Sequence, residues 1–438
     1  MDELVAGPRR KLVKEIWWSI EDNTLLFSKP IGEKAYHYRF DSDVWLPGRY
    51  ERRVFANLIR DMYGVEYSDN RLLLFNRVSL GEFAVAVYGE GLRLGVLEYR
   101  GRSWVLHATG ALASILVSIG AETVRVETRR RLKSKKIRLD SDREHVIVES
   151  GSHVGPAVRV GPGIYKVRDM APKGFRLLSD TGIEKLVERN EAYLKSLERE
   201  AVGFAQRLDP GPNKKVYVAF SGGADSTATL AIAVEAFGAD RVTAVYVDTG
   251  IEFPDTLHYA EKIASELGVD FVVVESGGVF WRELPREGPP SRDRRWCTAK
   301  LKIEALKRFY EHVRPRLILE GVRGFESQAR MMLGSVTSSP VAPTARRAFP
   351  IYEWSRLEVQ LYLAWKGLPT NPLYDKGLTR IGCVVCPAMH LFELWDVSRR
   401  LYPYLVESIL ERFAVLVGRE IVTSGDWRFL GGPAEKWR

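Results

Sequence analysis

The stretch VYVAFSGGADST, residues 216–227, is the most informative segment of the sequence. Its apolar run ends abruptly in Ser-Gly-Gly, and an acid and two hydroxyl residues follow. Glycine reaches backbone angles that are closed to other residues and exposes its amide to an anion. A helix that begins near Ser226 would add its positive end to the same site. The stretch therefore predicts a buried strand, an anion-binding turn and a helix start. It does not predict a Walker-type loop, which would end in Gly-Lys-Ser.

Asp225 is unexpected in a pure anion site, because a carboxylate repels phosphate. Asp225 could act as a magnesium ligand beside a polyphosphate, or it could cap the start of the helix. The residues alone leave both interpretations open.

The chain on the carboxyl side of residue 213 has the pattern of a parallel sheet. The apolar runs KKVYVAF, RVTAVYVDT, DFVVVES and PRLILEG alternate with segments of helical periodicity. Strands buried on both faces and separated by helices form parallel sheets, which bind ligands at the carboxyl ends of their strands. SGGADST, DTGIEFPDT and EGVRGFES all follow such strands. We expect an α/β fold with a Rossmann-like parallel sheet and helices on both faces.

The first part of the chain has a different pattern of apolar and polar residues. Short runs such as FAVAVYG and HVIVESG alternate apolar and polar residues, which predicts half-exposed strands and a β-rich N-terminal region. A long amphipathic helix is expected next, and the segment DPGPN at 209–213 predicts a hinge. We expect five parts, namely an α+β region at 1–100, a β-rich domain at 101–180, a linker helix and hinge at 181–210, a catalytic domain at 211–400 and a helical extension at 401–438.

Composition limits the class of protein. The chain has 438 residues, 45% hydrophobic and 28% charged, which indicates a globular protein of two or three domains. It has only three glutamines, and this together with its many charges is typical of a thermophile, here expected to be an archaeon. No apolar stretch reaches the length of a membrane helix, so no membrane partner and a cytoplasmic location are expected.

The formal charge is +9, and the densest basic run is RRRLKSKKIR at 129–138. Two interpretations stay open for this run. It could be a charged sheet edge that resists aggregation, or a surface that contacts the phosphate backbone of RNA or DNA.

Several motifs in the second half of the chain resemble a known family. SGGxDS resembles the signature of the PP-loop ATP pyrophosphatases. Further motifs resemble the branch that includes phosphoadenosine phosphosulfate (PAPS) reductase. They are DTGIEFPDT (248–256), RRWCTAKLKI (294–303), EGVRGFESQAR (320–330), FPIYEW (349–354) and LPTNPLYDKGLTRIGCVVCP (368–387). The resemblance covers about residues 211–400 and implies binding of ATP, or of PAPS or adenosine phosphosulfate (APS), with Mg²⁺.

The resemblance also implies roles for individual residues. It assigns the phosphates to Ser221, Gly222, Gly223, Asp225 and Ser226, the adenosine to Asp248 and Thr249, and the surrounding nucleotide site to Gly321, Arg323, Ser327 and Arg330. Asp225, Arg323 and Cys297 are the expected catalytic residues. From its chemistry, Arg323 suits a two-pronged contact with phosphate or sulfate oxygens, whereas Arg330 could instead form a salt bridge along a helix. Position 224 is alanine, where sulfonucleotide reductases commonly have lysine.

The only cysteines are Cys297, Cys383 and Cys386. The Cys-x-x-Cys spacing lets two thiolates face one ion. Zinc would need a fourth ligand, for which His390 is a candidate, and buried unreactive thiols are a further alternative. The resemblance favours a 4Fe-4S cluster held by three cysteines with one open iron.

Three classes of function follow. The first is an ATP-dependent enzyme that adenylates a nucleic acid such as tRNA and then transfers sulfur to it from a sulfur donor. In this hypothesis the segment from about 136 to 180, which resembles PUA-like RNA-binding barrels, presents the RNA. The second is reduction of PAPS or APS to sulfite, against which Ala224 and the lack of any cysteine after Cys386 both argue; DNA phosphorothioation is related chemistry. The third is a non-catalytic nucleotide- or RNA-binding module. A homodimer is expected as the assembly.

Overall fold

The computed structural model describes residues 12–128 and 132–431, which form two compact units. The N-terminal unit is Val13–Tyr193, and the C-terminal unit comprises Leu12 and the described residues from Leu194 onward. The boundary falls inside the long helix α3 (Ile183–Gln206). The segment 209–213, expected to be the hinge, lies within the C-terminal unit. In the described residues, no helix combines the length and the apolar character needed to cross a membrane.

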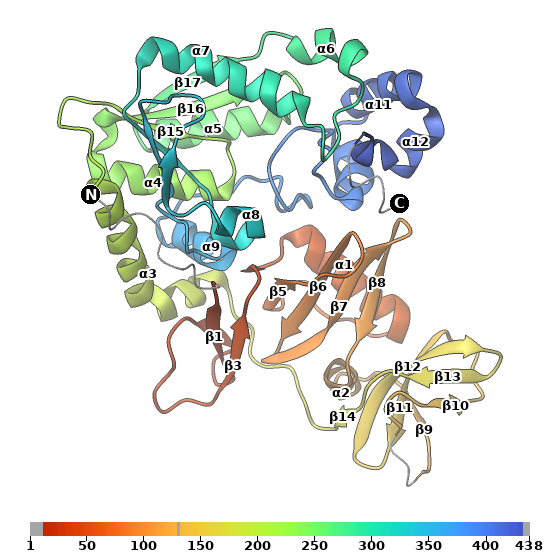
Figure 1. The fold of residues 1–438 in the computed structure, drawn as a ribbon. Helices are drawn as coiled ribbons and strands as arrows, with labels where there is room; N and C mark the ends of the chain where they lie inside the picture. The colour runs from red at the N-terminus through yellow and green to blue at the C-terminus, as the bar shows by residue number, and fades with distance from the viewer. Residues whose placement is uncertain (1–11, 129–131, 432–438) are drawn as a thin grey trace. The chain divides into compact units, whose positions relative to one another are not determined.

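The N-terminal unit is built mainly from strands in three sheets (Figure 1). The first has the order β2-β1-β3, the second β4-β5-β6-β7-β8 and the third β10-β13-β12-β11-β9, with β14 also paired to β12. The predicted β-rich region is confirmed. Its elements are β1 (Lys14–Ser19), β2 (Thr24–Leu26), β3 (Ala35–Phe40), β4 (Val44–Trp45), α1 (Arg49–Tyr63), β5 (Leu73–Arg77), β6 (Phe83–Gly89), β7 (Leu92–Arg100), β8 (Ser103–Ala108), α2 (Gly110–Ser118), β9 (Thr123–Arg125), β10 (Lys136–Arg138), β11 (His145–Ser150), β12 (His153–Gly161), β13 (Ile164–Val167) and β14 (Ala171–Pro172).

The C-terminal unit contains one mixed sheet with the order β17-β16-β15-β18-β20-β19. All neighbours pair in parallel except β19 and β20. Its strands are β15 (Val216–Ala219), β16 (Val242–Asp248), β17 (Asp270–Glu275), β18 (Leu317–Glu320), β19 (Val336–Ser338) and β20 (Arg346–Ala348). Its main helices are α4 (Ala224–Phe237), α5 (Pro254–Glu266), α6 (Val279–Glu287), α7 (Glu304–Val313), α8 (Gln328–Met331), α9 (Arg356–Trp365), α10 (Arg399–Leu401), α11 (Pro403–Val417) and α12 (Arg419–Ser424).

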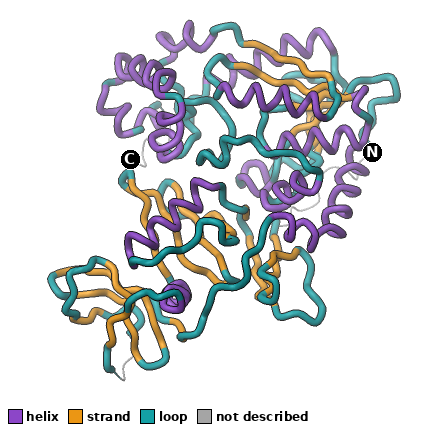
Figure 2. The backbone as a smooth tube through the Cα atoms, turned by 180° about the vertical axis from the view of Figure 1, so that it is seen from behind, coloured by secondary structure: helices purple, strands orange, loops and turns teal. Residues whose placement is uncertain are grey.

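Helices cover both faces of this sheet, as Figure 1 and Figure 2 show. Val216 and Val218 of β15 pack with α4 and α5 residues in one apolar cluster. Tyr217, which points to the opposite face because side chains alternate along a strand, packs against residues of α7. The predicted α/β fold, with a parallel sheet between two helical layers, is confirmed.

Candidate functional site

The stretch that the sequence predicts to bind phosphate lies where the direction of the sheet's connections reverses. β15 pairs with β16 on one side and with β18 on the other. The chain leaves β15 toward β16 and β17, whereas β18 leads outward to β20. The loops after β15 and β18 therefore diverge and leave a crevice at the carboxyl ends of the strands, which is where open α/β sheets bind ligands.

A polar pocket of about 230 Å³ occupies this position. Both diverging loops contribute to its walls, together with part of the segment that carries the paired cysteines. The lining residues are Ala219, Ser221, Gly223, Asp225, Ser226, Glu320, Gly321, Val322, Glu326, Arg330, Tyr374, Arg380 and Ile381. The structure thus brings together most of the residues that the sequence assigned to phosphate binding.

The glycine turn holds its shape through contacts from distant parts of the chain. Gly222 has φ +68°, and a Cβ atom at this position would lie 2.8 Å from Cγ2 of Thr256. Asn371 donates from Nδ2 to the Gly222 carbonyl over 3.1 Å. The backbone N–H of Ala224, the first residue of α4, donates to the Tyr374 hydroxyl over 3.1 Å. Only glycine fits at position 222, because both the angle and the space exclude a side chain.

Ser226 braces the turn from inside the helix. Its hydroxyl donates to the Gly223 carbonyl over 2.9 Å and accepts from the backbone N–H of Ser221 over 3.2 Å. Residue 226 lies on the first turn of α4, which begins two residues earlier, at Ala224. The positive end of α4 therefore points at the turn, as the sequence predicted.

Asp225, which lines the polar pocket, forms an ion pair with Arg323. Nε of Arg323 donates to Oδ1 of Asp225 over 2.8 Å, and Arg323 is only 3% exposed. The sequence predicted Arg323 to be a fork for phosphate or sulfate oxygens. In the structure its Nε contacts the Asp225 carboxylate, and Arg323 is not among the described residues that line the pocket.

Counted together with the arginines that pair with its carboxylates, the pocket has four positive and three negative side chains. Arg330 pairs with Glu326, and Arg347 contacts both carboxylate oxygens of Glu320 over 2.6 Å. Each carboxylate in the pocket lining thus has an arginine partner, and Arg380 adds a further positive charge. Burial, and after it the charge of Arg380, lowers the pKa of Arg330. An anion that enters would relieve this crowding of positive charge.

Two further residues assigned to the nucleotide site have mainly structural contacts. A Cβ atom on Gly321 would lie 2.6 Å from the backbone carbon of Asp225, so the loop after β18 packs directly on the start of α4. Ser327 caps α8, where its hydroxyl accepts from the N–H of Arg330 over 3.2 Å. Ser327 is not among the described residues that line the polar pocket.

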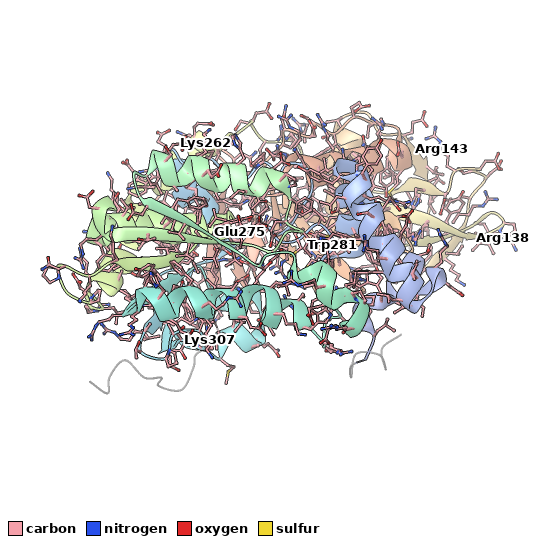
Figure 3. All side chains as sticks on the ribbon, turned by 90° about the horizontal axis from the view of Figure 1, so that it is seen from above. Arg138, Arg143, Lys262, Glu275, Trp281 and Lys307 are labelled. Atoms are coloured by element: carbon pink, nitrogen blue, oxygen red, sulfur yellow. The ribbon has the colours of Figure 1, made fainter. Side chains whose placement is uncertain are left out.

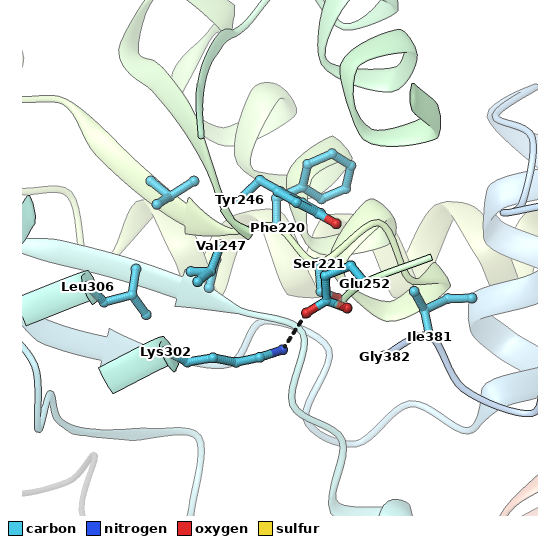
Figure 4. A pocket seen from close by; sticks show the side chains of 11 residues that line it. Phe220, Ser221, Tyr246, Val247, Glu252, Lys302, Leu306, Ile381 and Gly382 are labelled. Atoms are coloured by element: carbon cyan, nitrogen blue, oxygen red, sulfur yellow. Dashed lines mark ion pairs between the residues drawn. The ribbon is translucent and has the colours of Figure 1, made fainter. Parts of the chain in front are cut away.

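An apolar pocket of about 170 Å³ adjoins the polar one (Figure 4). The two share Ala219, Ser221 and Ile381 as walls. The other lining residues are Phe220, Val245, Tyr246, Val247, Glu252, Lys302, Leu306 and Gly382. One compartment is therefore charged and suited to phosphates, and its neighbour is largely apolar and suited to a flat organic ring.

Cys383 contacts Glu252, which lines the apolar pocket. The Cys383 thiol donates to Oε1 of Glu252 over 3.5 Å, and Thr249 donates to the same oxygen over 3.0 Å. Lys302 forms an ion pair with Glu252 over 3.3 Å. The sequence assigned Thr249 to the adenosine, whereas here its hydroxyl faces the thiol. The Asp248 carboxylate accepts from the Gly250 N–H over 2.8 Å.

The three thiols influence one another electrostatically. Burial raises the pKa of Cys383, and Glu252 raises it further, whereas the Lys302 ammonium lowers it. Burial, followed by the nearby Cys386, raises the pKa of Cys297. The three sulfur atoms thus share one region. Among the described residues, no three His, Cys, Asp or Glu side chains are arranged to hold a single metal ion, and the His390 ring stacks on Phe392.

A buried carboxylate closes the loop that carries Arg380 and the paired cysteines. Glu393 is fully buried. It accepts from the N–H of Thr379 over 2.7 Å and from the N–H of His390 over 2.8 Å, and so joins the two ends of the loop. Burial raises its pKa. Glu393 thereby couples the position of Arg380 to that of the thiols.

Sequence reasoning gave no role to Glu252, Lys302, Tyr374 or Arg380, although all four lie in the motifs. A signal was present for the two cations, since each stands within five residues of a cysteine. No signal in the sequence indicated that the Tyr374 hydroxyl would meet the glycine turn 150 residues away.

Comparison with known proteins identifies this part of the chain. Residues 215–389 match the model of the phosphoadenosine phosphosulfate reductase domain. This part of the chain is therefore similar to the PAPS reductase domain. It includes both pockets and all three cysteines.

Similar proteins match over different lengths. An uncharacterized protein of Methanocaldococcus jannaschii is 28% identical over 85% of this chain and 92% of its own length. The adenosine 5'-phosphosulfate reductase of Deinococcus radiodurans is 30% identical, over 33% of this chain and 56% of its own length. The crystal structure of PAPS reductase from Candida auris, in a phosphate complex, superposes with a TM-score of 0.35 and 20% identity. It covers 47% of this chain and 97% of the reductase.

Proposed function

We propose that the C-terminal unit binds an adenine nucleotide, with its phosphates in the polar pocket and its nucleoside in the apolar pocket. The observation that carries this proposal is the junction of the two pockets at Ser221, directly after β15. A nucleotide has a charged half and a flat apolar half joined at one point, and the two compartments match these halves. The glycine turn and the start of α4 supply amides and a positive dipole end for the phosphates.

We further propose that the reaction is ATP-dependent adenylation followed by sulfur transfer. An acceptor oxygen attacks the α-phosphorus of ATP and forms a bond to it, while the bond to the leaving pyrophosphate breaks. A sulfur nucleophile from a donor then displaces AMP. Arg330 and Arg380 would neutralise the charge on the leaving pyrophosphate, and Asp225 would help to hold Mg²⁺ beside the phosphates.

We propose that the three cysteines hold an iron-sulfur cluster. Their donor atoms are thiols that lie near one another, with the Lys302 ammonium close to two of them. Cys297, Cys383 and Cys386 would hold the cluster, which when bound would supply an open iron for sulfide or substrate.

Reduction of APS or PAPS to sulfite is a second candidate. The similarity to the adenosine 5'-phosphosulfate reductases of Deinococcus radiodurans and Salinibacter ruber favours it. The chain spans little more than half the length of each of these relatives. The polar pocket would then hold the phosphosulfate group in place of a triphosphate.

A nucleic acid is the proposed acceptor, and the N-terminal unit its binding surface. Lys136 on β10 stands directly opposite Lys166 on β13. Like charges in direct cross-strand register destabilise a sheet, so a polyanion that binds there would relieve the repulsion. Figure 3 shows Arg138, on the edge strand β10, on the outside of this sheet. Residues 129–131 of the basic run lie outside the described residues.

The experiment that tests the reaction offers ATP with RNA, and separately APS and PAPS, to protein purified without oxygen. Release of pyrophosphate from ATP supports adenylation. Formation of sulfite from APS or PAPS supports reduction and contradicts adenylation. If none of the three nucleotides binds, the nucleotide site itself is wrong. Iron and acid-labile sulfide are measured on the same protein and on the Cys297→Ser variant. Stoichiometric zinc without iron would contradict the cluster.

A further inference from the structure

The Tyr374 hydroxyl belongs to the polar pocket, and the proposed chemistry gives it no role. Tyr374 is half-buried and lines this pocket. Its hydroxyl accepts from the backbone N–H of Ala224, the first residue of α4, over 3.1 Å. A Cβ atom on Gly223 would lie 3.3 Å from this hydroxyl and 3.5 Å from the hydroxyl of Ser221. The phenol oxygen therefore lies directly beside the glycine turn, where Ser221 and Gly223 line the pocket.

Three contacts fix the position of this phenol. Asn371, which is fully buried, donates to the Gly222 carbonyl over 3.1 Å. The backbone N–H of Tyr374 donates to the Asn371 carbonyl over 3.1 Å, so residues 371–374 form a turn that is tied to the glycine turn. The Arg356 guanidinium lies over the Tyr374 ring, 5.2 Å from its centroid. The hydroxyl is thus held in place before any ligand binds, which lowers the entropic cost of binding.

The proton of this hydroxyl is available to a further partner. A phenol oxygen that accepts from one N–H keeps its own proton for another acceptor. Among the described residues, the Ala224 amide is the one hydrogen-bond partner of the hydroxyl, and it is a donor. Accepting that bond makes the phenol a stronger donor, because hydrogen bonds in a chain polarise one another. Burial raises the pKa of Tyr374 against the effect of the nearby Arg356 charge, so the hydroxyl stays protonated near neutral pH.

An anion is the ligand that suits a donor in this position. The positive end of α4 attracts negative charge to the same point, and the carboxylates that line the pocket already have arginine partners. We propose that Tyr374 is a phosphate-binding residue, whose hydroxyl donates a hydrogen bond to a phosphate or phosphosulfate oxygen beside the glycine turn. This inference rests on the proposed nucleotide site and adds to it a binding residue that lies 150 residues from Ala224 in the sequence.

The contact with Ala224 gives the proposal a direction that an experiment can measure. A hydroxyl that only capped α4 would occupy an amide that a phosphate could otherwise use, so its removal would strengthen the binding of phosphate. A hydroxyl that donates to the phosphate has the opposite effect, because its removal takes away a contact with the ligand. The sign of the change in affinity therefore separates the two roles.

The test uses Tyr374→Phe in the full chain, with Tyr259→Phe as the matched control. The Tyr259 hydroxyl also joins α4 to the segment that leads to Tyr374. It contacts the Thr227 hydroxyl over 3.1 Å and donates to the Pro369 carbonyl over 2.8 Å. Tyr259 lines neither of the two pockets. Calorimetry measures the affinity of each protein for pyrophosphate and for ATP, and thermal melts without ligand measure stability.

Tyr374→Phe should bind pyrophosphate and ATP about tenfold to a hundredfold more weakly, as expected for loss of a hydrogen bond to a charged group. Tyr259→Phe should keep both affinities, although each variant loses a hydrogen bond and should melt at a lower temperature. Unchanged or tighter binding in Tyr374→Phe, or an equal loss in both variants, would overturn the inference while the nucleotide site stands. If the wild-type protein binds neither pyrophosphate nor ATP nor the sulfonucleotides, the proposed site fails and this inference fails with it.

Discussion

Nε of Arg323 donates to Oδ1 of Asp225 over 2.8 Å, and this bond joins the loop after β18 to the first turn of α4. The pair lies between the two loops that diverge at the switch point of the sheet. It therefore links the two loops whose residues form the walls of the polar pocket.

Removal of the Asp225 carboxylate should destabilise the protein as well as impair the site. Asp225→Ala removes the carboxylate that pairs with the buried Arg323 charge, so we expect a loss of about 3 kcal/mol in the free energy of unfolding. Asp225→Asn keeps an acceptor for the guanidinium and should lose less. Chemical denaturation of both variants checks this order. Equal stability of the wild type and Asp225→Ala would show that the pair contributes nothing to folding.

Two glycine substitutions should have opposite effects. In Gly321→Ala the new Cβ meets the backbone of Asp225 at 2.6 Å, so α4 must shift; we expect a loss of about 1–3 kcal/mol and much weaker nucleotide binding. Gly203 lies inside α3 with only the end of the Arg207 side chain nearby, so Gly203→Ala should stabilise by about 0.5–1 kcal/mol. Thermal melts and ATP titrations of both variants decide this. A stabilised Gly321→Ala would contradict the close approach of the two loops.

Arg380 should contribute to anion binding without contributing to folding. Its charge lies close to the half-buried Arg330, so Arg380→Ala relieves repulsion in the empty protein and should not lower the melting temperature. The affinity for ATP or APS should fall about tenfold to a hundredfold, as expected for loss of a charge-assisted contact. Arg419→Ala removes an equal charge at the start of α12 and serves as the control. Calorimetry that found both variants equal to the wild type would remove Arg380 from the site.

Glu393 should make stability depend on pH. Burial raises its folded pKa above the ordinary value of 4.5, so the folded protein holds this proton over a pH range where the unfolded chain has released it. The contribution to stability is therefore complete below about pH 4.5 and decreases as the pH rises through the folded pKa. Glu393→Gln cannot ionise, so its stability relative to the wild type should improve from pH 4 to pH 7. Urea denaturation across this range measures the difference, and a difference that stays constant with pH would contradict the raised pKa.

A charge reversal in the N-terminal unit should raise stability and weaken RNA binding. Lys166→Glu converts the cross-strand repulsion with Lys136 into attraction, so we expect stabilisation of about 0.2–1 kcal/mol. RNA binding should weaken, and the dependence of the affinity on salt should become less steep. Lys29→Glu changes the net charge equally at an exposed position of the same unit and is the control. If the two variants bind RNA equally well, this face of the sheet is not the contact surface.

Local patterns in the sequence predicted the alternation of the first four strands with helices in the C-terminal unit and the place of the glycine turn. These features are local: apolar runs, helical periodicity and Ser-Gly-Gly each act over a few residues, and the fold prediction is confirmed. The sequence also indicated that three loops would meet at one sheet edge, because parallel strands end at the same edge.

Only the tertiary structure decided which side chains meet at that edge. Arg323 contacts Asp225, which is 98 residues away in the sequence, and the Ala224 amide contacts the Tyr374 hydroxyl, which is 150 residues away. Such contacts depend on how whole elements pack, and no local pattern encodes the distance between residues so far apart in the chain.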